Sequence, residues 1–450
     1  MTIILLFILT LILAKAIWVI YGTFWHGNLV KEEAEVVRRA NYLISKVATS
    51  PKQLMDAMPK QIPSQFQGEW AIYSCSMTCK ALANIAALYP QNVYKEQIAK
   101  IISIAMSVEI RGYDAERWDE DPLKGLDGNV SHLSYYSHLA WMIGEYKLLY
   151  NDNQFDALYH SLCEAMYRRI GNSPILNIPT YPFEQIYIPD MLVAIVALNI
   201  YSKIYNGRYQ DLVQKWMDAA KGEWMDKETG LLVSFMSNSG TISPMIKGSY
   251  SALNCYYLSL IDIEFAKQQF RILKKHFKKT LPLITGVKEY HSEKCLFGFD
   301  IDAGPIVFGL SPSGTGFALG AATMCNDYKF RKQILRTAEI ACSTFSYNGK
   351  SHYLLANVAL VGEAILLAMR TTQHGDSSTH WQERCSYNSP ASSYNMAGFL
   401  LSDSIERLTL HHQNVKRDEK DSEMDICWNI PDSDSCWWIW SVDSLRQQDE

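Results

Sequence analysis

The chain has 450 residues, a net charge of -5, and 48% hydrophobic residues. This length allows two or three ordinary domains or one large repetitive domain with a sizeable core. No basic stripe runs through the sequence, which argues against a nucleic-acid-binding protein. Aromatic residues reach 12%, a supply that suits a ring-lined pocket and also a large helical core.

The first segment, residues 1–30, contains an apolar run over residues 3–24 that is about long enough to span a bilayer. No Lys or Arg precedes this run, so we expect an uncleaved, single-pass membrane anchor, with a cleaved signal peptide as the alternative. Basic residues follow the run, and the positive-inside rule then favours a cytoplasmic main domain, while Lys15 inside the run argues against so simple an assignment. The side of the membrane is left open.

From residue 31 to residue 372 the hydrophobic pattern is helical throughout. Six segments are apolar on nearly all sides: 69–89, 131–150, 189–205, 249–261, 311–324 and 353–369. Six amphipathic segments alternate with them: 31–49, 92–109, 154–170, 208–222, 262–279 and 327–343. Helices that are apolar all round belong inside and one-faced helices outside, so the pattern predicts an all-α (α/α)6 barrel, or toroid, of about twelve helices. A two-layer helical solenoid is the alternative.

The connections between these helices differ in length. Links from an apolar to an amphipathic helix are short, and the reverse links are long: 50–67, 110–130, 171–188, 223–248, 280–310 and 344–352. Because the helices alternate in direction, all long links meet at one face, which we call the loop face. Long loops usually carry function, so we expect the site there. Residues 225–235 are expected to form a turn and a short strand, and 373–450 a polar, partly disordered tail.

Asp190 is the strongest catalytic candidate, because it stands between a polar link and a buried helix. Partial burial would raise its pKa into the range of a general acid or base, whereas the helix N-terminus would oppose that shift. The alternative is a carboxylate that only caps the helix or meets its dipole. His138, one turn inside an apolar helix, is either a proton relay near neutral pH or a buried core histidine. Tyr73, near the start of the first apolar helix, is either a site residue or a packed tyrosine.

Other polar and aromatic residues of the long links are candidates for substrate binding. Trp118 and Asp119 lie in an acidic, aromatic link, and Glu184 lies in the link before the third apolar helix. Asp302 follows a second aspartate by two residues, a pair that could bind a metal or a sugar, or cap a turn. No His or Glu spacing complements that pair, and the zinc, phosphate-loop and dinucleotide motifs are missing, so we expect no metal and no cofactor.

Between about residue 69 and residue 277 the chain resembles the linalool dehydratase/isomerase family, bacterial terpene-alcohol enzymes with an (α/α)6 fold and no cofactor. The stretches that carry the resemblance are EWAIYSCSMTCKALANIAALYP, RWDEDPLKGLDG, HLAWMIGEYKLLY, PFEQIYIPDMLVAIVALNIYSKIYNGRYQ and EWMDKETGLLVSF. The resemblance implies that Tyr73 and His138 line the pocket.

The chain also departs from that family. Where the family has two cysteines and a glutamate, this chain has Tyr181, Pro182 and Asp190, and a family aspartate and tyrosine have no clear match in residues 50–67. The same dehydration is therefore not expected unchanged. Asp190 could still supply acid/base chemistry at this place, and Tyr181 is expected to contact substrate.

Three functions follow from these residues. The first, which we favour, is a membrane-anchored, cofactor-free lyase or isomerase that uses Asp190, His138 and Tyr73 on an apolar, isoprenoid-like alcohol in a deep apolar pocket. The second is a carbohydrate-active hydrolase, lyase or epimerase that pairs Asp190 with Asp119 or Asp302 in an open cleft. The third is a non-catalytic binding toroid. A small-molecule substrate and a membrane are the expected partners, nucleic acid is not, and homo-oligomers are left open.

Overall fold

The computed structural model describes residues 5–7, 9–15, 17, 29–292 and 295–373. The predicted C-terminal tail, apart from its first residue, and most of the predicted membrane anchor lie outside the described residues. Within the described ranges, no helix has both the length and the apolar character needed to cross a membrane.

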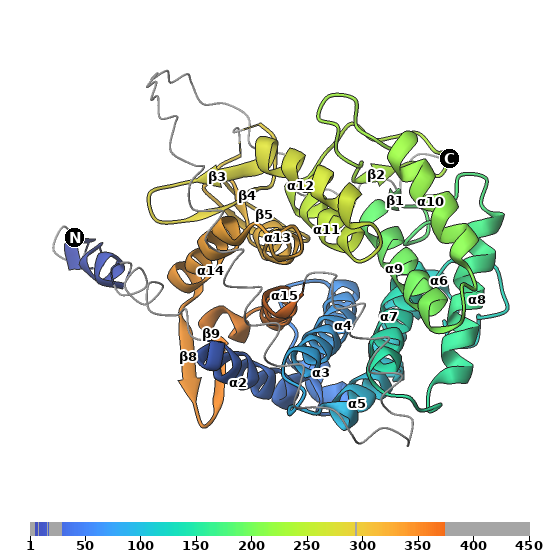
Figure 1. Ribbon diagram of the computed structural model, residues 1–450, viewed down its shortest axis with the longest axis horizontal. Helices are drawn as coiled ribbons and strands as arrows, with labels where there is room; N and C mark the ends of the chain where they lie inside the picture. The colour runs from blue at the N-terminus through green and yellow to red at the C-terminus, as the bar shows by residue number, and fades with distance from the viewer. Residues whose placement is uncertain (1–4, 8, 16, 18–28, 293–294, 374–450) are drawn as a thin grey trace, which may run out of the picture. The chain divides into compact units, whose positions relative to one another are not determined.

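Six helices of the described chain form a closed inner ring. In chain order they are α4 (Ser64–Leu88), α7 (Leu133–Leu149), α9 (Ile188–Ile204), α11 (Gly248–Ser259), α13 (Pro312–Met324) and α15 (Leu360–Thr371). Each packs against the next, and α15 packs against α4, so the ring closes (Figure 1). In α9 every residue from 191 to 202 is buried, as expected for a helix surrounded on all sides. The closed ring is the predicted barrel and excludes the solenoid.

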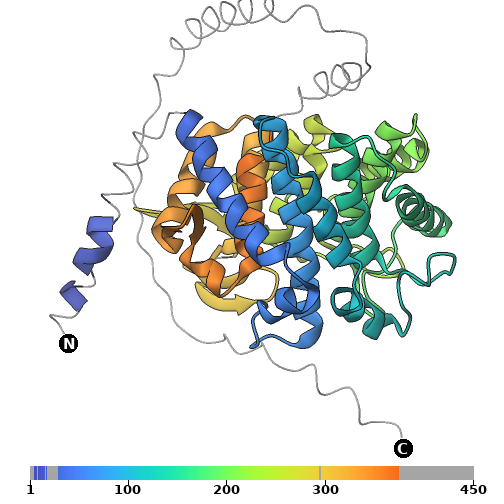
Figure 2. The same cartoon turned by 90° about the horizontal axis from the view of Figure 1, so that it is seen from below.

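Outer helices cover this ring. Among the described residues they are α2 (Leu29–Val47), α5 (Lys95–Ala105), α8 (Asp156–Asn172), α10 (Gln210–Gly222), α12 (Ile263–Phe277) and α14 (Tyr328–Cys342). In α12 only one face is buried, through Phe265, Phe270 and Leu273 among others, which is the amphipathic pattern of an outer helix. Figure 2, seen from the side, shows inner and outer helices running next to one another along a common direction.

The link between α5 and α7 differs from the prediction. The predicted helix over residues 92–109 ends early, and a separate helix, α6 (Val108–Trp118), occupies the start of the predicted loop. It ends at Asp119, which has a left-handed backbone with φ of 54°. The helix buries Ile110, Tyr113 and Asp114, at helical spacing, and it packs on α4. Its charged residues hid this short apolar face in the sequence.

The other long links carry further short elements. Helix α3 (Pro51–Asp56) lies in the first, and β1 (Ile186–Tyr187) pairs with β2 (Phe235–Met236). The predicted turn and short strand over 225–235 correspond to the bridge between Met225 and Leu232 and to β2. The 3-10 helix η1 (Leu354–Asn357) precedes α15, which therefore begins seven residues later than the predicted helix at 353–369.

Two links contain antiparallel sheets that the sequence did not predict. The link before α13 forms a five-stranded sheet of order β3-β4-β7-β6-β5, from β3 (Lys278–Thr280), β4 (Thr285–Lys288), β5 (Phe297–Asp300), β6 (Gly304–Val307) and β7 (Leu310–Ser311). The link before α15 forms a hairpin of β8 (Thr344–Tyr347) and β9 (Lys350–Tyr353). Gly248 begins α11 against β4, where an added Cβ would lie 1.8 Å from the carbonyl oxygen of Lys288, so only glycine permits this approach.

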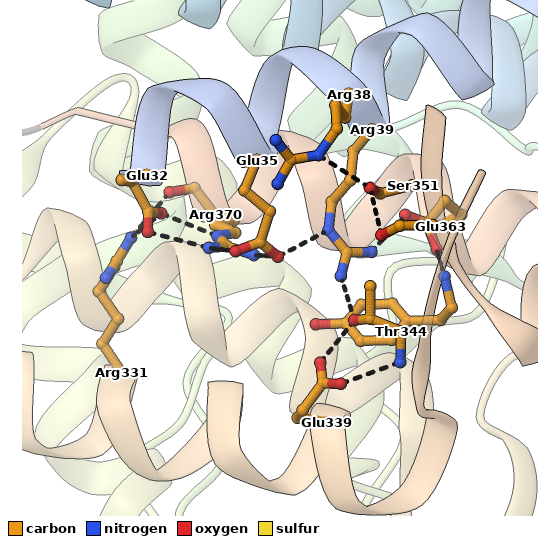
Figure 3. A network of polar contacts seen from close by, with 12 residues as sticks. Glu32, Glu35, Arg38, Arg39, Arg331, Glu339, Thr344, Ser351, Glu363 and Arg370 are labelled. Atoms are coloured by element: carbon orange, nitrogen blue, oxygen red, sulfur yellow. Dashed lines mark hydrogen bonds and ion pairs between the residues drawn. The ribbon is translucent and has the colours of Figure 1, made fainter. Parts of the chain in front are cut away.

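Ion pairs hold the first outer helix to the last inner helix (Figure 3). Arg370 on α15 donates to both Glu32 and Glu35 on α2, with N···O distances of 2.8–3.1 Å. Arg39 on α2 donates to Glu363 on α15 at 2.8 Å, and both side chains are 1% exposed. Removing one partner of such a buried pair leaves an uncompensated charge and costs about 3–5 kcal/mol, so this seam between α2 and α15 is sensitive to the loss of either partner.

Candidate active site

Asp190 lies in the first turn of α9, at the loop face of the ring. Its carboxylate accepts hydrogen bonds from the hydroxyls of Tyr73 on α4, at 3.1 Å, and of Thr180 in the preceding link, at 3.0 Å. Both partners are side chains from other segments, so the carboxylate does more than cap its own helix. Burial raises the pKa of Asp190 to about 6, with help from the charges of Asp302 and Glu184 and against the two hydrogen bonds.

Glu69 on α4 is a second carboxyl group with a shifted pKa. Burial raises its pKa to about 8, and the charges of Asp190 and Asp302 add to the effect, although Arg117 opposes it. The Glu69 Oε2 atom lies 3.6 Å from the Arg117 guanidinium. At neutral pH Glu69 is therefore mostly protonated and Asp190 mostly ionised. Environments that separate two pKa values in this way are how enzymes assign an acid and a base.

Arg117 and Tyr181 form one wall of the site. The guanidinium lies over the Tyr181 ring, 3.4 Å from its centroid. The Tyr181 hydroxyl is 3.1 Å from the Ser134 hydroxyl, which is in turn 2.9 Å from that of Tyr113. Glu184 stands at the rim, 3.9 Å from Arg117 and with 44% of its side chain exposed. This wall thus places the Arg117 cation beside Glu69, and the Glu184 carboxylate at its rim is exposed to solvent.

A buried pair fixes α6, and with it Arg117, in place. Asp114 on α6 and His132, which precedes α7, are both fully buried, with Oδ2 and Nδ1 2.5 Å apart. His132 has a left-handed backbone with φ of 49°, and its ring meets the Trp118 ring edge-on, with centroids 5.9 Å apart. Burial raises the pKa of Asp114, and its bond to His132 opposes this shift. The pair joins α6, which carries Arg117, to the start of α7.

Lys247, just before α11, holds the turn between β5 and β6. Its ammonium donates to Asp300 at 2.9 and 3.0 Å and to Asp302 at 3.2 Å. Asp300 also accepts hydrogen bonds from the backbone N–H groups of Asp302 and Ala303. It therefore caps the turn, one of the three roles considered for this aspartate pair. Asp302 keeps 34% of its side chain exposed and acts electrostatically on Asp190. Asp302 is thus a carboxylate of the site that another part of the fold positions.

His138 supports Tyr73 from the interior of the ring. The two rings pack with centroids 4.1 Å apart, and His138 Nδ1 lies 2.9 Å from the Ser76 hydroxyl. Burial lowers the pKa of His138 to about 3, so the imidazole is neutral across the physiological range. This argues against the predicted proton relay near neutral pH and favours a role in orienting Tyr73.

No protein-family model matches this sequence. In fold the chain is similar to a crystal structure described as an unsaturated glucuronyl hydrolase specific for heparin, with a TM-score of 0.50, 11% identity, and coverage of 76% of this chain and 95% of that one. A glycoside hydrolase of family 105 from C. acetobutylicum ATCC 824 matches with a TM-score of 0.40, 13% identity, and coverage of 66% and 92%. At 11% identity the first match shows a shared fold, the (α/α) barrel.

The structure brings together the three residues predicted as catalytic, because Tyr73 bonds to Asp190 and packs on His138. It also distinguishes between Asp119 and Asp302, the two carboxylates predicted as partners of Asp190. Asp302 is among the charges that raise the pKa of Asp190, whereas Asp119 is exposed at the end of α6. Of the two predicted partners, Asp302 is therefore the one that acts electrostatically on Asp190.

The sequence analysis missed Glu69 and Arg117. Glu69 lies four residues before Tyr73, so both share one face of α4, a spacing that could have revealed it. Trp118 lies outside the carboxyl cluster and lines a separate cavity of about 450 Å³. In the part of the chain that the structure describes, no group of three His, Cys, Asp or Glu side chains is arranged to hold a metal ion.

Proposed function

We propose that the protein is a carbohydrate-active enzyme that cleaves a glycosidic bond, with Glu69 as general acid and Asp190 as general base. The observation that carries the proposal is the carboxyl cluster at the loop face. Tyr73, one turn from Glu69 on α4, donates to Asp190 at 3.1 Å, and Arg117 lies 3.6 Å from Glu69. The raised pKa values of about 8 for Glu69 and about 6 for Asp190 suit an acid and a base. Partly exposed carboxylates such as Glu184 and Asp302 surround them, which suits a hydroxyl-rich ligand better than an apolar alcohol. The fold shared with an unsaturated glucuronyl hydrolase adds support.

In the proposed step, the carboxylic acid of Glu69 donates its proton to the glycosidic oxygen as the bond from that oxygen to the sugar carbon breaks. Asp190 accepts a proton from the water that attacks this carbon. The new carboxylate of Glu69 is stabilised by the Arg117 guanidinium, 3.6 Å away. Asp190 then releases its proton, and Glu69 regains one, by exchange with solvent, so the net reaction consumes one water.

The test is a screen of oligosaccharides, first those that end in an unsaturated glucuronyl unit, with release of the new sugar ends as the readout. We expect the wild type to cleave at least one of them. Glu69→Gln and Asp190→Asn should each lower the rate by about 10²–10⁴-fold, the range for a lost acid or base. Asp119→Asn is the matched control, because Asp119 is an exposed carboxylate of the same region. A screen without turnover, or full activity in Asp190→Asn, would contradict the proposal.

A second candidate is the isoprenoid-alcohol lyase or isomerase that the family resemblance implies. The observation in its favour is that Tyr73 contacts both Asp190 and His138. Turnover of an apolar alcohol such as linalool, abolished by Tyr73→Phe, would support it in place of the glycosidase. Binding of sugars without turnover by the wild type would instead support the non-catalytic toroid.

A further inference from the structure

A cavity of about 450 Å³ lies beside the carboxyl site. Its lining comes from the end of α6, the link that follows α6, the end of α8, and the link to α9. All four segments belong to the loop face. The volume falls within the range of roughly 300–1,000 Å³ that is typical of small-molecule pockets.

One wall of the cavity is held rigid by arginine. Arg169 donates to the carbonyl oxygens of Gly125 at 2.6 Å, Gly128 at 3.0 Å and Ser131 at 3.1 Å. Arg168 donates to the carbonyl oxygen of Gly128 at 2.8 Å. The link is therefore fixed before any ligand arrives, which lowers the entropic cost of binding. Because the Arg169 guanidinium already donates to backbone carbonyl groups, it is not available to bind an anionic ligand in the cavity.

The cavity adjoins the carboxyl site through the chain itself. Trp118 follows Arg117, and Pro179 precedes Thr180, so two lining residues are immediate neighbours of site residues. Consecutive Cα atoms are about 3.8 Å apart, so the cavity lies close to the carboxyl site on the loop face.

The lining groups suit a neutral sugar. The indole of Trp118 offers an apolar ring against which the face of a sugar can pack. The amides of Asn129 and Asn172 and the hydroxyl of Ser173 also line the cavity and complement hydroxyl groups.

We infer that this cavity is a second sugar-binding subsite, which holds a neutral unit of an oligosaccharide whose reacting unit lies at Glu69 and Asp190. The inference rests on the proposed function. It makes the substrate an oligosaccharide rather than a monosaccharide derivative, and it gives Trp118 the role of a specificity-determining residue.

The test compares kcat/KM for a disaccharide and for the corresponding tetrasaccharide. We expect the wild type to prefer the tetrasaccharide about tenfold, the effect of roughly 1.4 kcal/mol of binding. Trp118→Ala removes the ring, and Asn172→Trp fills the cavity from its exposed rim. Both should reduce the ratio to about one. Tyr328→Ala is the control, because Tyr328 is a 65% exposed aromatic residue that follows a short link on the opposite face.

The outcomes separate the two proposals. If the wild type cleaves both substrates equally well, or if both variants keep the preference, the subsite is refuted and the proposed function stands. If the wild type cleaves no sugar, the proposed function fails and the subsite with it. Should Trp118→Ala unfold, as its melting curve would show, Asn172→Trp decides the question, because it leaves the packing of Trp118 on His132 intact.

Discussion

Replacing Tyr73 by phenylalanine should narrow the pH range of activity from its acid side. The Tyr73 hydroxyl donates to Asp190 at 3.1 Å, and this bond lowers the pKa of Asp190, which burial nevertheless raises to about 6. A hydrogen bond to a charged group contributes about 1.5–3 kcal/mol, and one pKa unit corresponds to about 1.4 kcal/mol, so losing it should raise the pKa of Asp190 by roughly one to two units. Asp190 must be ionised to act as a base, so the acid limb should move to higher pH.

The assay is kcat/KM against pH, because this ratio reports the pKa values of the free enzyme. The wild type should show a bell with limbs near 6, for Asp190, and near 8, for Glu69. In Tyr73→Phe only the acid limb should move. Tyr187→Phe is the control, because the Tyr187 hydroxyl donates to Glu184 instead, at 2.9 Å. An acid limb that stays in place, or that moves to lower pH, would refute the assignment of Asp190 as the base.

Three further predictions concern stability and positioning. Glu69→Gln should melt at a higher temperature than the wild type above about pH 8 but not near pH 5, because the native pKa raised by burial to about 8 costs the wild type a few kcal/mol as pH rises from 4.5. Arg39→Met leaves the buried Glu363 unpaired and should lower the free energy of unfolding in urea by about 3–5 kcal/mol, whereas the neighbouring Arg38→Met should cost about 1 kcal/mol. Lys247→Met should free the turn between β5 and β6 and lower kcat/KM, and Lys247→Arg should recover part of the loss. Equal losses in both would show that charge does not position this turn.

The helical framework could be predicted because the spacing of apolar residues along a helix shows which of its faces are buried. Helices α9 and α13 are apolar all round and lie inside, and the one-faced α12 lies outside. The five-stranded sheet escaped prediction because its strands have two to four residues, and the side chains of Phe297 and Phe299 on β5 are exposed, so no alternation marks them.

The site could be predicted only where it stands on the inner helices. Tyr73 and Asp190 come from the loop-face ends of α4 and α9, which the helical pattern located. Arg117 escaped because α6 was taken for a loop. The position of Asp119 depends on the left-handed end of α6, and that of Asp302 depends on a turn held by the distant Lys247. Such tertiary features leave no periodic pattern in the sequence.

The contrast between two glutamates argues that the carboxyl cluster serves function. Glu35 at the seam and Glu69 at the loop face have similar exposure, 25% and 20% of the side chain. At Glu35, burial would raise the pKa, but Arg370 and Arg39 outweigh it and hold the pKa at about 2. At Glu69, burial and neighbouring carboxylates prevail over a single arginine, and the pKa rises to about 8. At the seam, two arginines thus balance the charge of the ionised Glu35 carboxylate. At the loop face the chain accepts an unfavourable cluster, and groups whose pKa is perturbed in this way concentrate at functional sites.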